Sequence, residues 1–259
     1  PIQLDYKVLS GQSGNELMTK SQRFGQIKGV LFDKDGTLFD YYRTWVPILQ
    51  SAALLAARGD EAMATRLMGA CGFDATTGRV EAGGILAAGN TIELAGLWLS
   101  GDKTWEVATL TRALDDHFAA EAPLRSAPVT DLVAFFRELK ASGYRTGIAT
   151  NDNEASALAT VMRFDLTAHV EFVCGYDSGH GAKPEPGMVH AFCAATGLEP
   201  SQVAMVGDNF HDLEMARRAG AGLKVGVLTG TSLRSDLEGH ADIVLDSIVA
   251  LPAFLASTR

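Results

Sequence analysis

Short apolar runs alternate with helical patterns along the second half of the chain. The runs predict buried strands, and apolar residues that recur every three or four positions predict helices. We expect helices at 129–142, 154–162 and 186–196, and strands at 145–149, 170–174, 203–206, 224–228 and 242–245. Strands that alternate with helices form parallel sheets with helices on both faces, and such sheets bind ligands at the carboxyl ends of the strands. The predicted fold class is therefore α/β.

An earlier apolar run, Val30-Leu31-Phe32, predicts the first strand, and a different pattern follows it. The stretch from 41 to 125 is rich in Ala and Leu at helical spacing and contains no convincing strand. Helices are expected there at 43–58, 61–71, 91–100 and 103–120. We therefore predict a core domain made of 27–40 and 126–259, a helical domain at 41–125 inserted into it, and an N-terminal extension at 1–26.

The extension has a weak pattern of its own. Residues 1–9 alternate enough to predict a short strand, whereas residues 10–23 are polar and contain glycine. A secretory signal has a basic start and a long apolar core, and this stretch has neither. No apolar run in the sequence reaches the length that a bilayer requires. We expect a loosely attached lead-in and no membrane partner.

The amino-acid composition argues against several classes of protein and of partner. A hydrophobic content of 47% in 259 residues predicts an ordered, globular protein. The formal charge of -9 argues against nucleic acid or an anionic membrane as a partner, because both favour positive surfaces. The three cysteines are scattered and include no Cys-x-x-Cys pair, which predicts buried, reduced thiols in a cytoplasmic protein. The sequence leaves monomer and homodimer open.

Two carboxylates follow the first predicted strand, in Asp33-Lys34-Asp35-Gly36-Thr37. Side chains alternate along a strand, so Asp33 and Asp35 point in similar directions while Lys34 points away. Two close carboxylates repel each other unless a cation compensates them, and Mg²⁺ is the natural partner of oxygen ligands. The alternative is an ordinary polar turn, since Asp and Gly both favour turns.

A second acidic pair follows the strand predicted at 203–206. Asp208 stands at the strand exit, and Asp212 lies one helical turn beyond it, so both can face the same point. The alternative for Asp208 is an N-cap of the next helix. Capping by Asp208 leaves Asp212 unexplained.

Two further strand ends carry groups suited to an anion. Thr150 and Asn151 follow the strand at 145–149, where a hydroxyl, an amide and helix-start N–H groups gather. Lys183 stands before a proline in a Gly- and Pro-rich loop after the strand at 170–174. Taken singly, Thr150 can also be interpreted as a helix N-cap, and Lys183 as a solvated lysine on a loop.

Together the four strand ends resemble the four motifs of the haloacid dehalogenase-like hydrolase superfamily. The wording Asp-Lys-Asp-Gly-Thr, Ala-Thr-Asn, Ala-Lys-Pro-Glu-Pro and Gly-Asp-Asn-x-x-Asp is most similar to its phosphatase branch with a helical cap, which includes the phosphoglycolate phosphatases. The resemblance covers residues from about 27 to the end, although the cap matches only in position and helical character. It implies a Rossmann-like core with a C1-type α-helical cap.

The resemblance also implies a mechanism. Asp33 would attack phosphorus to form an aspartyl-phosphate, and Asp35 would serve as acid and then as base. Mg²⁺ would be held by Asp33, the Asp35 backbone carbonyl and Asp208, with Asp212 a ligand or a support through water. Lys183, Thr150 and the N–H groups near Asn151 would orient the phosphoryl oxygens. The expected protein is a Mg²⁺-dependent phosphomonoesterase acting on a small phosphorylated metabolite.

Other functions are weighed against the same residues. Haloacid dehalogenases and phosphonatases of the superfamily lack the second acid of the first motif, so Asp35 argues against both. A sugar phosphomutase of the same superfamily is the alternative enzyme, because the chemistry before transfer is identical. A non-catalytic phosphate-binding regulatory module is the alternative from another class.

Specificity is expected from the cap, since the core recognises groups common to many substrates. Arg79, in a glycine-rich break at 76–85, is a candidate to hold a substrate carboxylate such as that of phosphoglycolate, although an exposed arginine is the simpler interpretation. Lys34 replaces the apolar residue common in the family, and we expect it to lean toward solvent rather than to reach the substrate. His211 is a candidate to line the site, although a helix-capping or surface histidine is the simpler interpretation. Trp45 is expected in the core of the helical domain.

Overall fold

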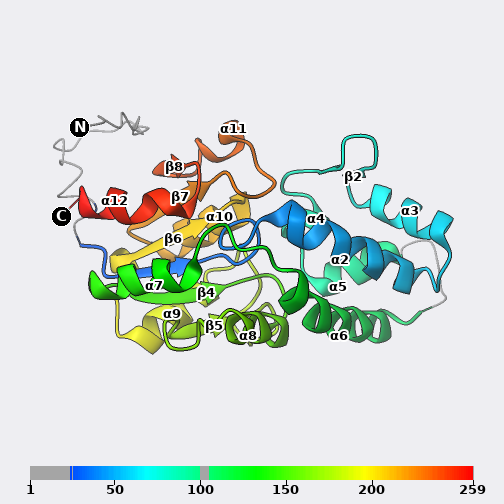
Figure 1. Cartoon of the computed structure of the whole chain (residues 1–259), viewed down its shortest axis with the longest axis horizontal. Helices are drawn as coiled ribbons and strands as arrows, with labels where there is room; N and C mark the ends of the chain where they lie inside the picture. The colour runs from blue at the N-terminus through cyan, green and yellow to red at the C-terminus, as the bar shows by residue number, and fades with distance from the viewer. Residues whose placement is uncertain (1–23, 25, 100–104, 259) are drawn as a thin grey trace.

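The computed structural model describes residue 24, residues 26–99 and residues 105–258. Six strands form one parallel sheet in the order β5-β4-β1-β6-β7-β8 (Figure 1). The strands are β1 (Gly29–Phe32), β4 (Arg145–Ala149), β5 (Phe172–Cys174), β6 (Val203–Gly207), β7 (Leu223–Val227) and β8 (Ile243–Leu245). This architecture confirms the predicted α/β fold with a parallel sheet.

Strand order places a crevice beside β1. The chain runs from β1 outward through β4 and β5, then returns to the other side of β1 and continues through β6, β7 and β8. Connections therefore diverge on either side of β1, which opens a crevice at the carboxyl ends of the central strands. The register aligns Phe32 with Ile148 on β4 and with Val206 on β6, so the residues that follow these strands begin side by side.

Alternation along the strands divides the core between the two faces of the sheet. Val30 and Phe32 pack into one hydrophobic cluster, and Leu31 packs into another on the opposite face. Helices α7 (Leu132–Ala141) and α12 (Leu251–Ala256) cover the first face, and α9 (Gly187–Thr196) and α10 (Phe210–Ala219) cover the second (Figure 1). Both faces are buried, which explains why the strands read as continuous apolar runs.

Residues 41–99 and 105–125 form a helical insert with a hydrophobic cluster of their own, beside the sheet in Figure 1. Its helices are α2 (Tyr41–Ala56), α3 (Glu61–Ala70), α4 (Ile85–Ala88), α5 (Thr91–Trp98) and α6 (Val107–Arg125). Asp40 begins the insert as the N-cap of α2, because its carboxylate accepts a hydrogen bond from the Arg43 N–H at 2.8 Å. The prediction that this region contains no strand is wrong, since β2 (Phe73–Asp74) and β3 (Arg79–Val80) pair as a short antiparallel hairpin.

Smaller elements complete the described chain. They are α8 (Glu154–Arg163), which packs along α6, α11 (Arg234–Leu237), and two short 3-10 turns at Pro200–Gln202 and Ile248–Ala250. Phe24, near the end of the predicted N-terminal extension, is buried in the core against Phe254. The strand predicted at 1–9 lies outside the described residues.

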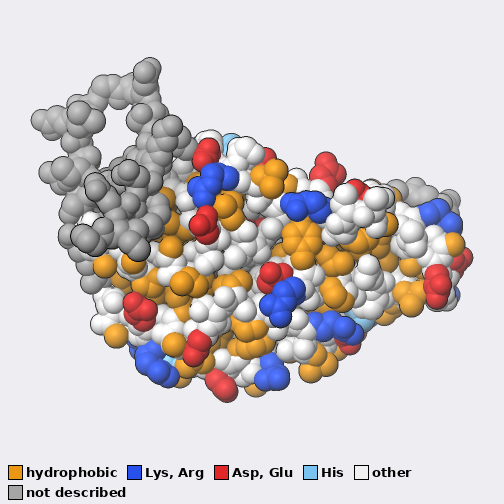
Figure 2. Space-filling view, turned by 45° about the horizontal axis from the view of Figure 1, so that its top comes forward, with side chains coloured by type: hydrophobic (Ala, Val, Ile, Leu, Met, Phe, Trp, Pro, Cys, Tyr) orange, Lys and Arg blue, Asp and Glu red, His pale blue; other side chains and the backbone are white. Residues whose placement is uncertain are grey.

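The described surface mixes charges of both signs. Figure 2 shows acidic and basic side chains interspersed among hydrophobic ones over the face that it presents. Of the helices in the described ranges, none has the length and apolar character to cross a bilayer.

Candidate active site

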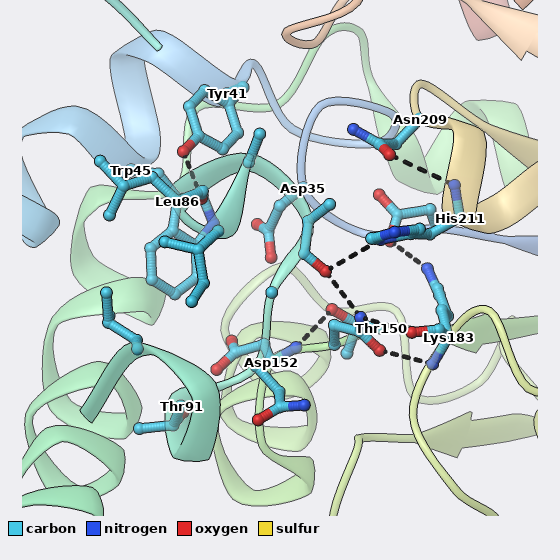
Figure 3. Close-up of a pocket in the computed structure, with 18 of the residues that line it drawn as sticks. Asp35, Tyr41, Trp45, Leu86, Thr91, Thr150, Asp152, Lys183, Asn209 and His211 are labelled. Atoms are coloured by element: carbon cyan, nitrogen blue, oxygen red, sulfur yellow. Dashed lines mark hydrogen bonds and ion pairs between the residues drawn. The ribbon is translucent and has the colours of Figure 1, made fainter. Parts of the chain in front are cut away.

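The strand ends bring the predicted residues to one cavity between the sheet and the helical insert (Figure 3). Asp33 and Asp35 follow β1, Thr150 follows β4, and Asp208 follows β6. The cavity, together with the solvent at its mouth, has a volume of about 680 Å³. Predicted site residues that line it are Asp33, Asp35, Thr150, Asn151, Lys183, Asp208 and Asp212.

Three buried carboxylates face one another in this cavity. One oxygen each from Asp33, Asp208 and Asp212 lies within 4.8 Å of the others, and the three residues are 5%, 3% and 2% exposed. Burial raises the pKa of Asp33 to about 7, although Lys183 opposes the shift, and burial also raises the pKa of Asp208 well above its ordinary value. Such a cluster is costly without a cation, so its chemistry fits a divalent ion with oxygen ligands.

Lys183 joins two of these acids. Its ammonium donates to Asp33 Oδ1 at 2.5 Å and to Asp212 Oδ1 at 2.7 Å. Burial favours the neutral amine, but attraction to Asp212 and Asp33 outweighs burial and raises the pKa of Lys183 above its ordinary value. The lysine is therefore charged and fixed beside the first acid, not solvated.

Asp212 also contributes to the start of α10. Its Oδ2 accepts a hydrogen bond from the Asn209 N–H at 3.1 Å, and the Asn209 side chain caps the helix in return. Asn209 is thus the N-cap, and the alternative that assigned capping to Asp208 is wrong. Asp208 is held from elsewhere, because its Oδ2 accepts from the Thr231 N–H at 3.1 Å.

Lys34 is the main departure from expectation. It is 0% exposed, and its ammonium lies 2.6 Å from Asp35 Oδ2 and 3.1 Å from Asp152 Oδ2. The ammonium also faces the Trp45 ring, 5.4 Å from the ring centroid. The expectation that Lys34 leans toward solvent is wrong. Burial opposes its charge, but the two carboxylates outweigh burial and raise the pKa of Lys34.

The Lys34 ammonium is shared by Asp35 and Asp152, so neither carboxylate has a cation of its own. Burial raises the pKa of Asp152, because Lys34 compensates it only partly while the negative charge of Asp35 lies nearby. Asp35 keeps one carboxylate oxygen, Oδ1, buried and without a hydrogen-bond partner. That oxygen is available to exchange a proton with a ligand in the cavity.

Thr150 and Asn151 have different roles in the structure. The Thr150 hydroxyl oxygen accepts from the Asp152 N–H at 3.0 Å, which leaves its hydrogen free to donate. Asn153, not Thr150, caps α8, so the capping alternative for Thr150 is wrong. Asn151 accepts from the Lys183 N–H at 2.8 Å and donates to the Ala88 carbonyl of the insert at 2.7 Å.

The insert closes the other side of the cavity through α4 and its neighbours. The Tyr41 hydroxyl donates to the Leu86 carbonyl at 2.6 Å, and His211 Nδ1 lies 3.4 Å from the Ala88 carbonyl. Trp45, which lies four residues after Tyr41 on α2, also lines the cavity, as does His211. Sequence reasoning favoured the core for Trp45 and a capping or surface role for His211, although the i, i+4 pair of aromatics directly after the first motif was a usable signal.

Arg79 is the predicted site residue that the structure does not bring to the cavity. It is exposed on β3, with its guanidinium 5.8 Å from the Tyr42 ring, and does not belong to the cavity lining. The glycine-rich break predicted at 76–85 instead forms the hairpin and its connection to α4.

Comparisons with known proteins agree with this geometry. A family model described as haloacid dehalogenase-like hydrolase matches residues 27–220. Phosphoglycolate phosphatase from Yersinia pestis is 27% identical over 86% of this chain and 90% of its own, and N-acetylmuramic acid 6-phosphate phosphatase from Pseudomonas aeruginosa is 26% identical over 85% and 91%. The crystal structure of CbbY from Rhodobacter sphaeroides in complex with phosphate has a similar fold, with a TM-score of 0.65 at 20% identity over 87% of this chain and 96% of that one.

Proposed function

Because this chain belongs to the haloacid dehalogenase-like hydrolase family, we propose that it is a Mg²⁺-dependent phosphatase that hydrolyses phosphomonoesters of small metabolites. The observation that carries the proposal is the pairing of two different carboxyl groups after β1. Asp33 is held by Lys183 beside Asp208 and Asp212, and Asp35, which lines the same cavity, has an unpaired oxygen. Proximity of a nucleophile and an acid–base group is the arrangement that covalent phosphoryl transfer requires.

The first half of the reaction transfers the phosphoryl group to the protein. An oxygen of Asp33 attacks phosphorus, the bond from phosphorus to the alcohol oxygen breaks, and Asp35 gives its proton to that oxygen. Lys183 and the free hydrogen of the Thr150 hydroxyl stabilise the negative charge on the phosphoryl oxygens. The products of this half are the free alcohol and an aspartyl-phosphate on Asp33.

The second half returns the protein to its starting state. Water attacks the phosphorus of the aspartyl-phosphate, Asp35 takes a proton from that water, and the bond between phosphorus and Asp33 breaks. Inorganic phosphate leaves, and Asp35 is again protonated. The same carboxyl group acts as acid and as base, which agrees with one side of it being free for ligand and the other side being fixed by Lys34.

Mg²⁺ would be held by Asp33, Asp208 and the backbone carbonyl of Asp35, and when bound it supplies positive charge to the phosphoryl oxygens. Asp212 supports the cluster through its bonds to Lys183 and to the Asn209 N–H. The ionised form of Asp33 is the nucleophile. Burial raises the pKa of Asp33, and a bound cation would lower it again and so favour the ionised form.

The helical insert at 41–125 would act as a C1-type cap over the core formed by 27–40 and 126–259. Support comes from its own hydrophobic cluster and from its contacts with the site, where Asn151 donates to the Ala88 carbonyl. A cap over the cavity excludes bulk water until the alcohol has left.

Phosphate release from a panel of phosphomonoesters, with and without Mg²⁺, tests the proposal. The panel contains phosphoglycolate and N-acetylmuramic acid 6-phosphate, after the relatives, together with 4-nitrophenyl phosphate. We expect Mg²⁺-dependent release that falls by at least roughly a thousandfold in Asp33→Asn. Asp116→Asn, on an exposed part of α6, is the matched control that keeps activity.

Trapping of the intermediate separates this mechanism from direct attack by water. Borohydride reduction of the acid-quenched enzyme is expected to convert Asp33 to homoserine only when substrate is present. A folded, Mg²⁺-loaded protein that releases no phosphate from any member of the panel would refute the phosphatase assignment.

A further inference from the structure

The two sides of the cavity differ in charge. Within its described residues, the helical insert contributes 12 of the lining residues, and every one of these 12 is uncharged. Most of this wall is hydrocarbon, formed by Tyr41, Trp45, Leu49, Leu86, Leu94 and Phe118. A phosphoryl group bound at Asp33 and Lys183 therefore directs its alcohol portion toward an apolar surface.

The core side is already rich in negative charge. Five carboxylates line it, from Asp33, Asp35, Asp152, Asp208 and Asp212. Against these stand the ammonium groups of Lys183 and of Lys34, and both are held by carboxylates. With Asp35 protonated and one divalent cation bound, the site has no excess positive charge for a second anionic group on the substrate.

A carboxylate on the alcohol portion has no counter-charge on this surface. Among the described lining residues, Lys183 is the sole Lys or Arg, and it is committed to Asp33 and Asp212. His211 lies on the core side next to Asp212, with Nδ1 close to the Ala88 carbonyl. An anion moved from water to an apolar wall loses its hydration without gaining an ion pair, which is strongly unfavourable.

We infer that the alcohol portion of the substrate is uncharged and mainly hydrocarbon, and that a carboxylate-bearing ester such as phosphoglycolate is a poor substrate. The inference rests on the proposed phosphatase function and specifies the substrate class of the same site. The wall also contains one buried donor without a protein partner, the indole N–H of Trp45. A neutral oxygen on the alcohol, such as a hydroxyl or an ether, would satisfy it.

Two pairs of substrates with matched shapes test the inference on the wild-type enzyme with Mg²⁺. Isobutyl phosphate is the uncharged counterpart of phosphoglycolate, since a branched dimethyl end replaces the carboxylate. 4-Isopropylphenyl phosphate is the counterpart of 4-carboxyphenyl phosphate, since the same branched end replaces the carboxylate. We expect kcat/KM to be at least roughly tenfold higher for the uncharged member of each pair, which corresponds to about 1.4 kcal/mol.

A charge placed in the wall should reverse this preference. Ile85 lines the cavity from α4 and is only partly buried, so Ile85→Lys adds a cation with little cost in packing. We expect Ile85→Lys to raise the ratio of kcat/KM for phosphoglycolate over isobutyl phosphate by roughly tenfold. Ile85→Met, with a side chain of similar length and no charge, is the control that leaves the ratio near that of the wild type.

The results distinguish failure of the inference from failure of the proposed function. If the enzyme turns over both members of a pair and does not prefer the uncharged one, in even one of the two pairs, the inference is overturned and the phosphatase assignment stands. A preference for the uncharged member in both pairs supports it. Absence of turnover with all four esters and with 4-nitrophenyl phosphate overturns both.

Discussion

Replacement of Lys34 by methionine is expected to destabilise the protein strongly, because the substitution leaves two acids without their shared cation. Lys34 is fully buried, with ion pairs of 2.6 Å to Asp35 and 3.1 Å to Asp152. Removal of one partner from a buried ion pair costs about 3–5 kcal/mol, since the remaining charge is buried without compensation. Methionine preserves most of the length of the chain, so loss of packing contributes little to the change.

The destabilisation should depend on pH. A carboxyl group whose pKa is higher in the folded than in the unfolded state favours folding at low pH, and this contribution is lost as pH rises toward the folded value. Burial already raises the pKa of Asp152, and without Lys34 the shift becomes larger. The gap between the wild type and Lys34→Met should therefore be smaller at pH 5 than at pH 8.

Urea unfolding followed by circular dichroism gives the free energy of unfolding at both values of pH. Lys34→Met/Asp152→Asn should recover roughly 0.5–3 kcal/mol relative to the sum of the single changes, because the neutral amide needs no counter-charge. Lys28→Met, at an exposed lysine before β1, is the control and should stay within about 0.5 kcal/mol of the wild type. A loss below about 1 kcal/mol in Lys34→Met at pH 8 would refute the reasoning.

Three further predictions concern the site and the cysteines. Asp35→Asn should lower kcat by roughly 10²–10⁴ for alkyl phosphates, which need a proton on the leaving oxygen, and by less for 4-nitrophenyl phosphate; equal losses would contradict the role of Asp35 as acid. Gly36→Ala should weaken activation by Mg²⁺, because φ is +87° and an added Cβ would lie 2.6 Å from Asp208 Cγ, whereas Gly143→Ala, with φ of +85° and open space, should cost stability alone. The three cysteines are buried, and burial raises the pKa of the Cys174 thiol to about 12, so 5,5′-dithiobis(2-nitrobenzoic acid) at pH 8 should label none of them before unfolding; rapid labelling of the native protein would show that burial is incomplete.

Sequence patterns were sufficient where a local signal determines the structure. The strand at Arg145–Ala149 was predicted with its observed bounds, because an apolar run between polar ends indicates a buried strand whatever surrounds it. The cluster of Asp33, Asp208 and Asp212 was also predictable, since Asp33 and Asp208 follow parallel strands that end at the same edge of the sheet and Asp212 lies one helical turn beyond Asp208.

The surroundings of Lys34 were not predictable in the same way. Alternation predicted that its side chain points away from Asp33 and Asp35, but its ammonium lies 2.6 Å from Asp35 Oδ2. Alternation also does not reveal what covers that side of the strand. In the structure Asp152, which lies just before α8 and is distant in sequence, and Trp45 on α2 cover it. A lysine next to a strand end is usually exposed, so the ion pairs that bury this one were invisible without the fold.

The sequence did not predict the apolar wall, for a related reason. The names of relatives are therefore a weak guide to the substrate of this protein. Helix α4 has only four residues, too few for a periodic pattern, and no side chain caps its start. Its position depends on the Tyr41 hydroxyl and the Asn151 amide, which donate to the carbonyls of Leu86 and Ala88. Because Asn151 also accepts from the Lys183 N–H, one amide holds both the loop that carries Lys183 and the apolar wall. The proposed catalytic residues follow from motifs shared with the family, whereas the proposed substrate class depends on this wall, whose residues no motif specifies.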